Sequence, residues 1–139
     1  MGNNFFDFNQ LKAEDAKILN PQVLAFVGDG VYSLYIRHFL SISHNVKSGE
    51  LHKLTTQFVK ATAQSDLANK LVEILNDTEL DIYKRARNYK TQSVAKNSSV
   101  AEYHRATGFE AVLGYLYLSG MYDRLNEILK FCTEKNNES

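Results

Sequence analysis

Two acidic residues, Asp29 and Glu110, stand where helices of this composition are expected to be apolar. At 100° per residue, each acid shares its sector of the helix with mostly apolar or aromatic neighbours. The neighbours of Asp29 in this projection are Ala25, Phe26, Tyr32, Ser33 and Ile36. We therefore expect that neither carboxylate lies on a solvated face. An unpaired buried carboxylate costs several kcal/mol or takes up a proton, so each acid needs a partner.

Glycines flank both acids, with Gly28 and Gly30 beside Asp29 and with Gly108 and Gly114 near Glu110. A glycine inside a helix costs about 1 kcal/mol relative to alanine. Something should compensate for this cost, and the close approach of another helix or of a ligand backbone would do so.

A divalent cation is one partner that two such carboxylates could share. Mg²⁺ fits best, because hard cations take carboxylate oxygens and water as ligands. The alternative is that each acid is satisfied inside the protein by Arg37, Arg105, a tyrosine hydroxyl or a helix N-terminus. The residue types alone leave both interpretations open.

Helices separated by short polar breaks account for the whole hydropathy pattern, without strand-like alternation. The first and longest begins at Pro21, with Asn20 as its N-cap. Thr78 with Asp81 forms a capping-box pattern for a later helix. The expected helices are 21–41, 49–59, 62–75, 79–89, 100–119 and 122–133, with a polar loop at 90–99 and a frayed tail at 134–139. The predicted fold class is all-α.

Length and composition fit one globular domain. Of the 139 residues, 44% are hydrophobic and 23% are charged, which is typical of a folded protein and not of a disordered one. The longest apolar run, 111–118, falls well short of the roughly 18–20 residues that span a bilayer, and the first residues lack the features of a secretory signal. The single cysteine, Cys132, suits a reducing compartment. We expect a cytoplasmic protein without membrane association.

Basic residues gather in one segment, although 16 basic and 16 acidic side chains cancel over the whole chain. This balance excludes a strongly basic tail that binds nucleic acid. No acidic residue occurs between Asp81 and Glu102. The basic residues of this segment are Lys84, Arg85, Arg87, Lys90 and Lys96. The local charge predicts either a phosphate-binding surface or a solvated basic loop with no partner.

Two motifs resemble those of ribonuclease III domains. Residues 24–31, LAFVGDGV, resemble the signature helix of that family, and residues 107–114, TGFEAVLG, resemble its second acidic helix. With KRARN at 84–88 and EAVLGYLYL at 110–118, the chain is similar to the Mini-ribonuclease III branch, which is a catalytic domain alone. The likeness covers about residues 20–129. We therefore expect a single catalytic domain over 1–139, with its core at about 20–130 and no double-stranded-RNA-binding domain.

The resemblance implies the helical ribonuclease III endonuclease fold, in a homodimer whose two sites each cut one strand of double-stranded RNA with Mg²⁺. It implies products with a 5′ phosphate and a 3′ hydroxyl. The implied substrate is the precursor of the large-subunit (23S) ribosomal RNA of bacteria, with a large-subunit ribosomal protein assisting. Asp29 and Glu110 match the acids of the family and are the expected catalytic and metal-binding residues.

Other residues are expected to support this chemistry. Ser33 and Arg37, one and two turns beyond Asp29, and Thr107, just before Glu110, either support the two carboxylates or serve only in helix packing. The residues expected to hold backbone phosphates are Lys84, Arg85, Arg87 and Lys90. A-form RNA hides its major-groove edges, so we expect selection by shape more than by base sequence.

The chain departs from ordinary ribonuclease III at three positions. Gln22, Ala25 and Thr107 stand where that family carries further acids, and the Mini branch tends to lack these acids as well. Two alternatives to the nuclease therefore remain. One is a ribonuclease III-like protein that binds duplex RNA with steep salt dependence but does not cleave it. The other is a helical interaction module whose basic loop binds an acidic protein, a binding for which duplex RNA would not compete.

Overall fold

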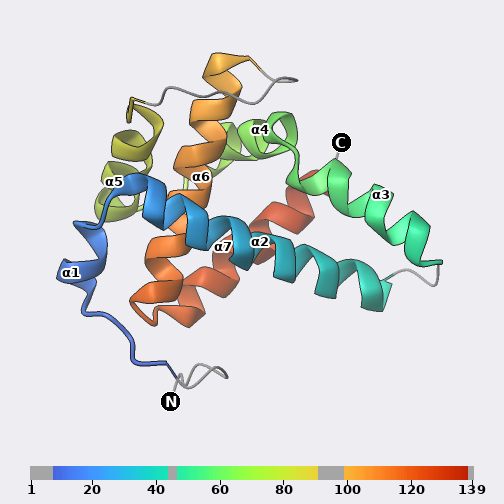
Figure 1. The fold of residues 1–139 in the computed structure, drawn as a ribbon, viewed down its shortest axis with the longest axis horizontal. Coiled ribbons are helices and arrows are strands. Elements are labelled where there is room, and N and C mark those ends of the chain that lie inside the picture. The colour runs from blue at the N-terminus through green and yellow to red at the C-terminus, as the bar shows by residue number, and fades with distance from the viewer. Residues whose placement is uncertain (1–7, 44–46, 91–98, 138–139) are drawn as a thin grey trace.

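The structure is a computed structural model that describes residues 8–43, 47–90 and 99–137, with side chains described to residue 134. The described residues form seven helices and no strand (Figure 1). The helices are α1 (Ala13–Lys17), α2 (Pro21–Ser43), α3 (Ser48–Val59), α4 (Ala61–Leu71), α5 (Asp77–Arg87), α6 (Val100–Leu118) and α7 (Tyr122–Asn137). The predicted all-α class is confirmed. In the described part of the chain, no helix combines the length and hydropathy needed to cross a membrane.

Most helix boundaries agree with the periodicity, and the exceptions have local causes. The short helix α1 was not predicted, because five residues are too few to show a period. Helix α5 begins two residues earlier than expected, since the capping box is formed by Asn76 with Glu79 and not by Thr78 with Asp81. Helix α4 ends at Leu71, not at 75, and α7 continues to Asn137, beyond the expected end at 133. Of the polar loop expected at 90–99, residues 91–98 lie outside the described residues.

Helix α6 forms the centre of the molecule, and the other helices pack around it (Figure 1). Its residues from Ala111 to Leu116 are all buried, as expected for a helix that is apolar on every side. Helix α2 crosses α6 and makes the most extensive packing with it, while α4 and α5 cover other sides of α6. The Asn20 side chain caps α2 by accepting a hydrogen bond from the Gln22 backbone N–H at 2.8 Å, as predicted.

Two glycines allow α2 and α6 to touch through their backbones. A Cβ at Gly28 would overlap the backbone carbonyl of Glu110, and a Cβ at Gly114 would overlap that of Leu24. The expected close approach of another helix is therefore confirmed for these two positions. Gly108 also meets the expectation, because a Cβ there would come within 3.0 Å of the ring and the backbone oxygen of Tyr83 on α5, whereas a Cβ at Gly30 would meet no atom within 4 Å.

Candidate active site

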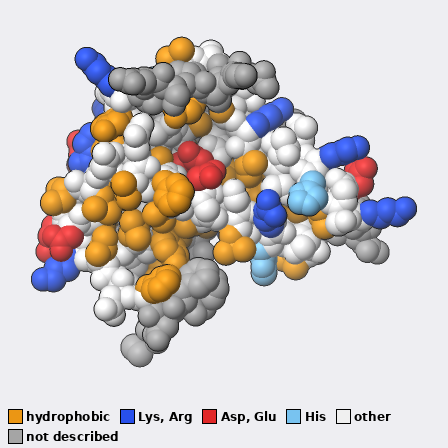
Figure 2. Space-filling model, viewed as in Figure 1, with side chains coloured by type: hydrophobic (Ala, Val, Ile, Leu, Met, Phe, Trp, Pro, Cys, Tyr) orange, Lys and Arg blue, Asp and Glu red, His pale blue; other side chains and the backbone are white. Residues whose placement is uncertain are grey.

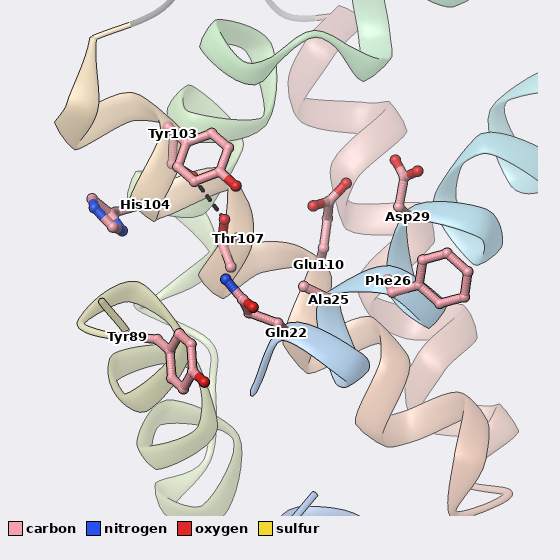
Figure 3. A pocket seen from close by; sticks show the side chains of 9 residues that line it. All are labelled: Gln22, Ala25, Phe26, Asp29, Tyr89, Tyr103, His104, Thr107 and Glu110. Carbon is pink, nitrogen blue, oxygen red and sulfur yellow. Dashed lines mark hydrogen bonds between the residues drawn. The ribbon is translucent and has the colours of Figure 1, made fainter. Parts of the chain in front are cut away.

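The crossing of α2 and α6 creates a pocket of about 360 Å³ that contains both acids (Figure 3). It is lined by Gln22, Ala25, Phe26 and Asp29 from α2, by Tyr103, His104, Thr107 and Glu110 from α6, and by Tyr89 beyond α5. The carboxyl groups of Asp29 and Glu110 lie side by side and point in the same direction (Figure 3). Residues 81 positions apart in the chain are thus brought together, because Gly28 packs against the backbone of Glu110 itself.

The two carboxylates differ in burial. Glu110 is half-buried, in line with the expectation, but Asp29 is exposed, so the expectation that it avoids a solvated face is wrong. The error has a physical cause. Phe26, which lies beside Asp29 in the helical projection, is apolar but 80% exposed. An apolar sector of α2 is therefore not always packed against other helices. One acid therefore stands at the base of the pocket and the other at its open edge.

Among the described residues, Glu110 has no cationic partner, and its pKa reflects this environment. Burial raises its pKa to about 9, and the hydrogen bond and negative charge of Asp29 act in the same direction. The nearby Gln64 side chain opposes these effects and lowers the pKa. Among the described residues, the ion pairs all involve Arg124, and none includes Asp29 or Glu110.

A second buried acid shows how the same fold satisfies a carboxylate that has only a structural role. Glu79 is 1% exposed, and burial by itself would raise its pKa. Two hydrogen bonds from Arg124, at 2.8 and 2.9 Å, and one from the Asn76 backbone outweigh that effect and lower the pKa. Glu110 lacks such a partner. Neither Arg37 nor Arg105 supplies one, because Arg105 Nε donates to Ser65 Oγ at 2.7 Å and Arg37 lines a different pocket.

The expected supporting residues lie in different places. Thr107 lines the pocket, but its hydroxyl donates to the Tyr103 backbone carbonyl at 3.0 Å (Figure 3). Ser33 and Arg37 do not line it. Arg37 instead borders a pocket between α2 and α3. The three positions at which further acids were absent, Gln22, Ala25 and Thr107, all line the pocket and leave it with two carboxylates.

The basic residues at the end of α5 are not equivalent. Lys84 and Lys90 are exposed. Arg85 is half-buried, and its Nη2 donates to the backbone carbonyl of Lys17, which ties α1 to α5. The Arg87 guanidinium lies 5.5 Å from the centre of the Tyr83 ring, and its Nε donates to Asn88 Oδ1 at 3.2 Å. Two of the four expected phosphate-binding residues therefore also have packing roles.

Sequence reasoning missed several residues of this site. Tyr89, Tyr103 and His104 line the pocket, and Gln64, on α4, interacts with Glu110 from within the protein. Tyr103 stands about two turns before Glu110 and falls on the same helix face, so helical spacing indicates it, whereas His104 falls about 120° away and spacing does not. Nothing in the local sequence around Gln64 marks it, because glutamine is common on exposed helix faces.

The donor set of the pocket fits a divalent hard cation. It offers two carboxylates that point in the same direction, and burial together with the neighbouring Asp29 raises the pKa of the more buried one, Glu110. The described residues contain no group of three or more His, Cys, Asp or Glu that could enclose a metal. Mg²⁺ tolerates such a site, because it retains several waters and is commonly held by one or two carboxylates together with phosphate oxygens.

Comparisons with known proteins agree with this geometry. Residues 22–121 match the model of the Ribonuclease III domain. The chain is 44% identical to the Mini-ribonuclease 3 of Clostridium tetani over 97% of its own length and 90% of that protein. It is 41% identical to the Mini-ribonuclease 3 of Enterococcus faecalis, over 90% and 96% of the two chains. A crystal structure of a protein from Fusobacterium nucleatum superposes with a TM-score of 0.78 at 29% identity, over 88% of this chain and 98% of the other.

The matched segment begins on α2 and ends beyond α6, so it contains Asp29, Glu110 and every other residue that lines the pocket. The likeness to the two named relatives extends over most of both chains. The chain therefore belongs to the ribonuclease III domain family, in its Mini-ribonuclease 3 group, and is an endoribonuclease of double-stranded RNA.

Proposed function

We propose that this protein is a Mg²⁺-dependent endoribonuclease that matures the ends of the precursor of large-subunit (23S) ribosomal RNA by cutting its double-stranded stems. The observation that carries the proposal is the pair of carboxylates, Asp29 and Glu110, that lie side by side in the lining of one pocket without a cationic partner among the described residues. The choice of RNA follows from the resemblance to Mini-ribonuclease III. The same substrate places the protein in the cytoplasm, where bacterial ribosomal RNA is made.

Asp29 and Glu110 are the residues that hold Mg²⁺ in this proposal. Mg²⁺ held by these two residues would supply an activated water and a positive charge beside the scissile phosphate. Glu110 is anchored in the central helix, while the exposed Asp29 stands on the side from which the RNA backbone approaches. Water loses a proton as it adds to phosphorus, the bond between phosphorus and the 3′ oxygen breaks, and that oxygen takes up a proton. The products are therefore a 5′ phosphate and a 3′ hydroxyl.

A cleavage assay on a precursor ribosomal stem tests the proposal directly. With Mg²⁺, both strands should be cut, and the Asp29→Asn variant should bind the same RNA but leave it intact. Ca²⁺ serves as a control, because its longer and less regular coordination suits this chemistry poorly. Binding without cleavage by the unaltered protein, even with large-subunit ribosomal proteins added, would overturn the proposal and favour a duplex-RNA binder that lacks catalysis.

Phosphate binding in this proposal depends mainly on Lys84 and Lys90, whose amino groups are free to reach RNA. Replacing both by alanine should weaken duplex binding and flatten the plot of log affinity against log salt concentration, by about 0.9 for each phosphate that the variant no longer neutralises. Binding is measured in Ca²⁺ to prevent cleavage. Lys53→Ala with Lys70→Ala removes two exposed charges elsewhere and is the matched control.

Arg85 and Arg87 are also expected to bind phosphate, but both have packing roles, so replacing them should affect the fold as well as RNA binding. Arg85→Ala should lower the stability of the fold, because it releases α1 from α5. If the slope of log affinity against log salt concentration is the same in the Lys84 and Lys90 double variant as in the unaltered protein, these lysines do not bind phosphate and the segment is a solvated basic loop.

We also propose that the protein acts as a homodimer through α2. Val23, Phe26 and Leu34 are 46%, 80% and 54% exposed. They fall on one stripe of the helix together with Gly30, where an added Cβ would meet no atom within 4 Å. Apolar side chains are spread over this face of the molecule (Figure 2). Exposed apolar patches of this kind mark contact surfaces, and the resemblance identifies a second copy as the partner.

Phe26→Arg tests the dimer, because a charged side chain in the centre of an apolar contact is costly to desolvate. The variant should sediment as a monomer at concentrations at which the unaltered protein is a dimer. Ile42→Arg is the control, since Ile42 is 73% exposed on another face of the same helix. A Phe26→Arg protein that remains dimeric would place the interface elsewhere.

A ribosomal protein that shapes the substrate completes the proposal. One domain of this size binds few phosphates, and affinity for duplex RNA rises with the number of phosphates bound. Dimerisation doubles that number. A large-subunit ribosomal protein that holds the precursor stem would raise the fraction of RNA in the cleavable form.

A further inference from the structure

One buried polar side chain remains unexplained by the fold. Gln64 lies on α4, which packs against α6, and is 2% exposed. Its Nε2 is buried and has no hydrogen-bond partner among the described residues. Buried amide groups are nearly always hydrogen-bonded, so an orphaned donor requires a specific reason. Its neighbour Ser65 is different, because Ser65 Oγ accepts a hydrogen bond from Arg105 at 2.7 Å.

The group that Gln64 faces is the carboxyl of Glu110. The side chain is close enough to that carboxyl to favour its charged form, although Nε2 completes no hydrogen bond with it, while the interaction between Glu110 and Asp29 acts in the opposite direction. Gln64 is buried and does not line the pocket, whereas Asp29 lines it and is exposed. A carboxylate that binds a cation through one oxygen can accept a hydrogen bond at the other, and such hydrogen bonds orient metal ligands.

We propose that Gln64 is a positioning residue of the metal site and that its Nε2 donates a hydrogen bond to the Glu110 carboxylate when that carboxylate holds a divalent cation. This inference rests on the proposed metal site at Asp29 and Glu110. It explains the orphaned donor, which lies close enough to the Glu110 carboxyl to favour its charged form but completes no hydrogen bond with it in the metal-free protein. It also explains why an amide stands in the core, where an apolar side chain of similar volume would pack without a polar penalty.

The test is the affinity of the full-length protein for Mn²⁺, measured by electron paramagnetic resonance from the signal of the free ion. Mn²⁺ takes the same oxygen ligands as Mg²⁺. Gln64→Met keeps the length of the side chain but removes the donor, and the Kd for Mn²⁺ should rise about tenfold, at the low end of the effect of an outer hydrogen-bond partner. The kcat on duplex RNA should fall, while KM for RNA stays unchanged because Gln64 does not reach the surface.

Ser65→Ala is the matched control. It removes the hydrogen bond between Arg105 on α6 and Ser65 on α4 but keeps Gln64 and Glu110, so its Kd for Mn²⁺ should equal that of the unaltered protein. The unfolding midpoint of metal-free Gln64→Met should not fall, because the variant loses no hydrogen bond in that state. Gln64→Leu repeats the measurement if the methionine variant does not fold.

Several results would overturn the proposal. Unchanged Mn²⁺ affinity in Gln64→Met would make Gln64 a packing residue, as would equal losses of affinity in Gln64→Met and Ser65→Ala. Failure of both Gln64 variants to fold would lead to the same conclusion. The metal site itself is tested by Asp29→Asn: if that variant binds Mn²⁺ as tightly as the unaltered protein, the proposed function is at fault and not only the role of Gln64.

Discussion

Glu110→Gln is expected to abolish RNA cleavage and at the same time to stabilise the metal-free protein. Cleavage should fall by about 10³-fold, because one of the two carboxylates that hold the cation is lost and metal assistance contributes several kcal/mol to such a reaction. The gain in stability has a separate origin. The carboxyl of Glu110 is half-buried beside Asp29, and no cation compensates it in the metal-free state.

The sign of the effect follows from proton binding. Burial and the neighbouring Asp29 raise the pKa of Glu110 from 4.5 to about 9. Between these two pH values the folded protein retains a proton that the unfolded chain releases, so stability falls as pH rises from 4.5 to about 9. At about 1.4 kcal/mol per pKa unit, the penalty at pH 7 is about 3 kcal/mol. Glutamine cannot ionise, so the variant should lose this slope.

Urea unfolding at several pH values, with and without Mg²⁺, measures both effects. The unaltered protein should become less stable toward pH 9 and should be stabilised by Mg²⁺, since a ligand that binds only the folded state stabilises it. The Glu110→Gln variant should be more stable than the unaltered protein at pH 7. Its free energy of unfolding should change less with pH and should not change when Mg²⁺ is added. Full cleavage activity in this variant, or a stability that still responds to Mg²⁺, would remove Glu110 from the metal site.

Gly28→Ala is expected to have the largest effect on folding. The added Cβ would overlap the backbone carbonyl of Glu110 in the central helix. A backbone group cannot rotate away as a flexible side chain does, so α2 must move away from α6. Overpacking usually costs about 1–3 kcal/mol. Here the clash is with the backbone at the main helix crossing, so we expect a loss of stability of about 4 kcal/mol or more. Few point substitutions have so large an effect. Gly114→Ala should behave alike, because its Cβ would meet the Leu24 carbonyl.

The matched control is Gly49→Ala, on α3, where a Cβ would meet no atom within 4 Å. There the higher helix propensity of alanine should leave stability unchanged or raise it by up to about 1 kcal/mol. Urea unfolding followed by circular dichroism at 222 nm compares the three variants. If Gly28→Ala and Gly49→Ala unfold at the same urea concentration, α2 and α6 do not cross as closely as described, and the two carboxylates are not positioned by that crossing.

The amino-acid sequence by itself determined the helices and singled out both acids. Asn20 and Pro21 start α2 through local hydrogen bonding and a preset backbone angle, so no distant residue is needed to predict that start. A charge inside an apolar helix, as at Glu110, is likewise visible without a structure. The helical ribonuclease III fold and the pairing of Asp29 with Glu110 followed from motifs that lie within a few residues of each acid.

Only the tertiary structure decided which faces of these helices touch one another. Gly28 and Gly30 both stand beside Asp29 in the sequence. A Cβ at Gly28 would overlap the backbone of α6, whereas a Cβ at Gly30 would meet no atom within 4 Å. Arg85 and Lys84 are adjacent basic residues, yet one ties α1 to α5 and the other is free. Gln64 became part of the site only through the packing of α4 on α6. Caps and periodicity act over one or two turns of chain, whereas the packing of faces depends on residues far apart in sequence, which local patterns do not encode.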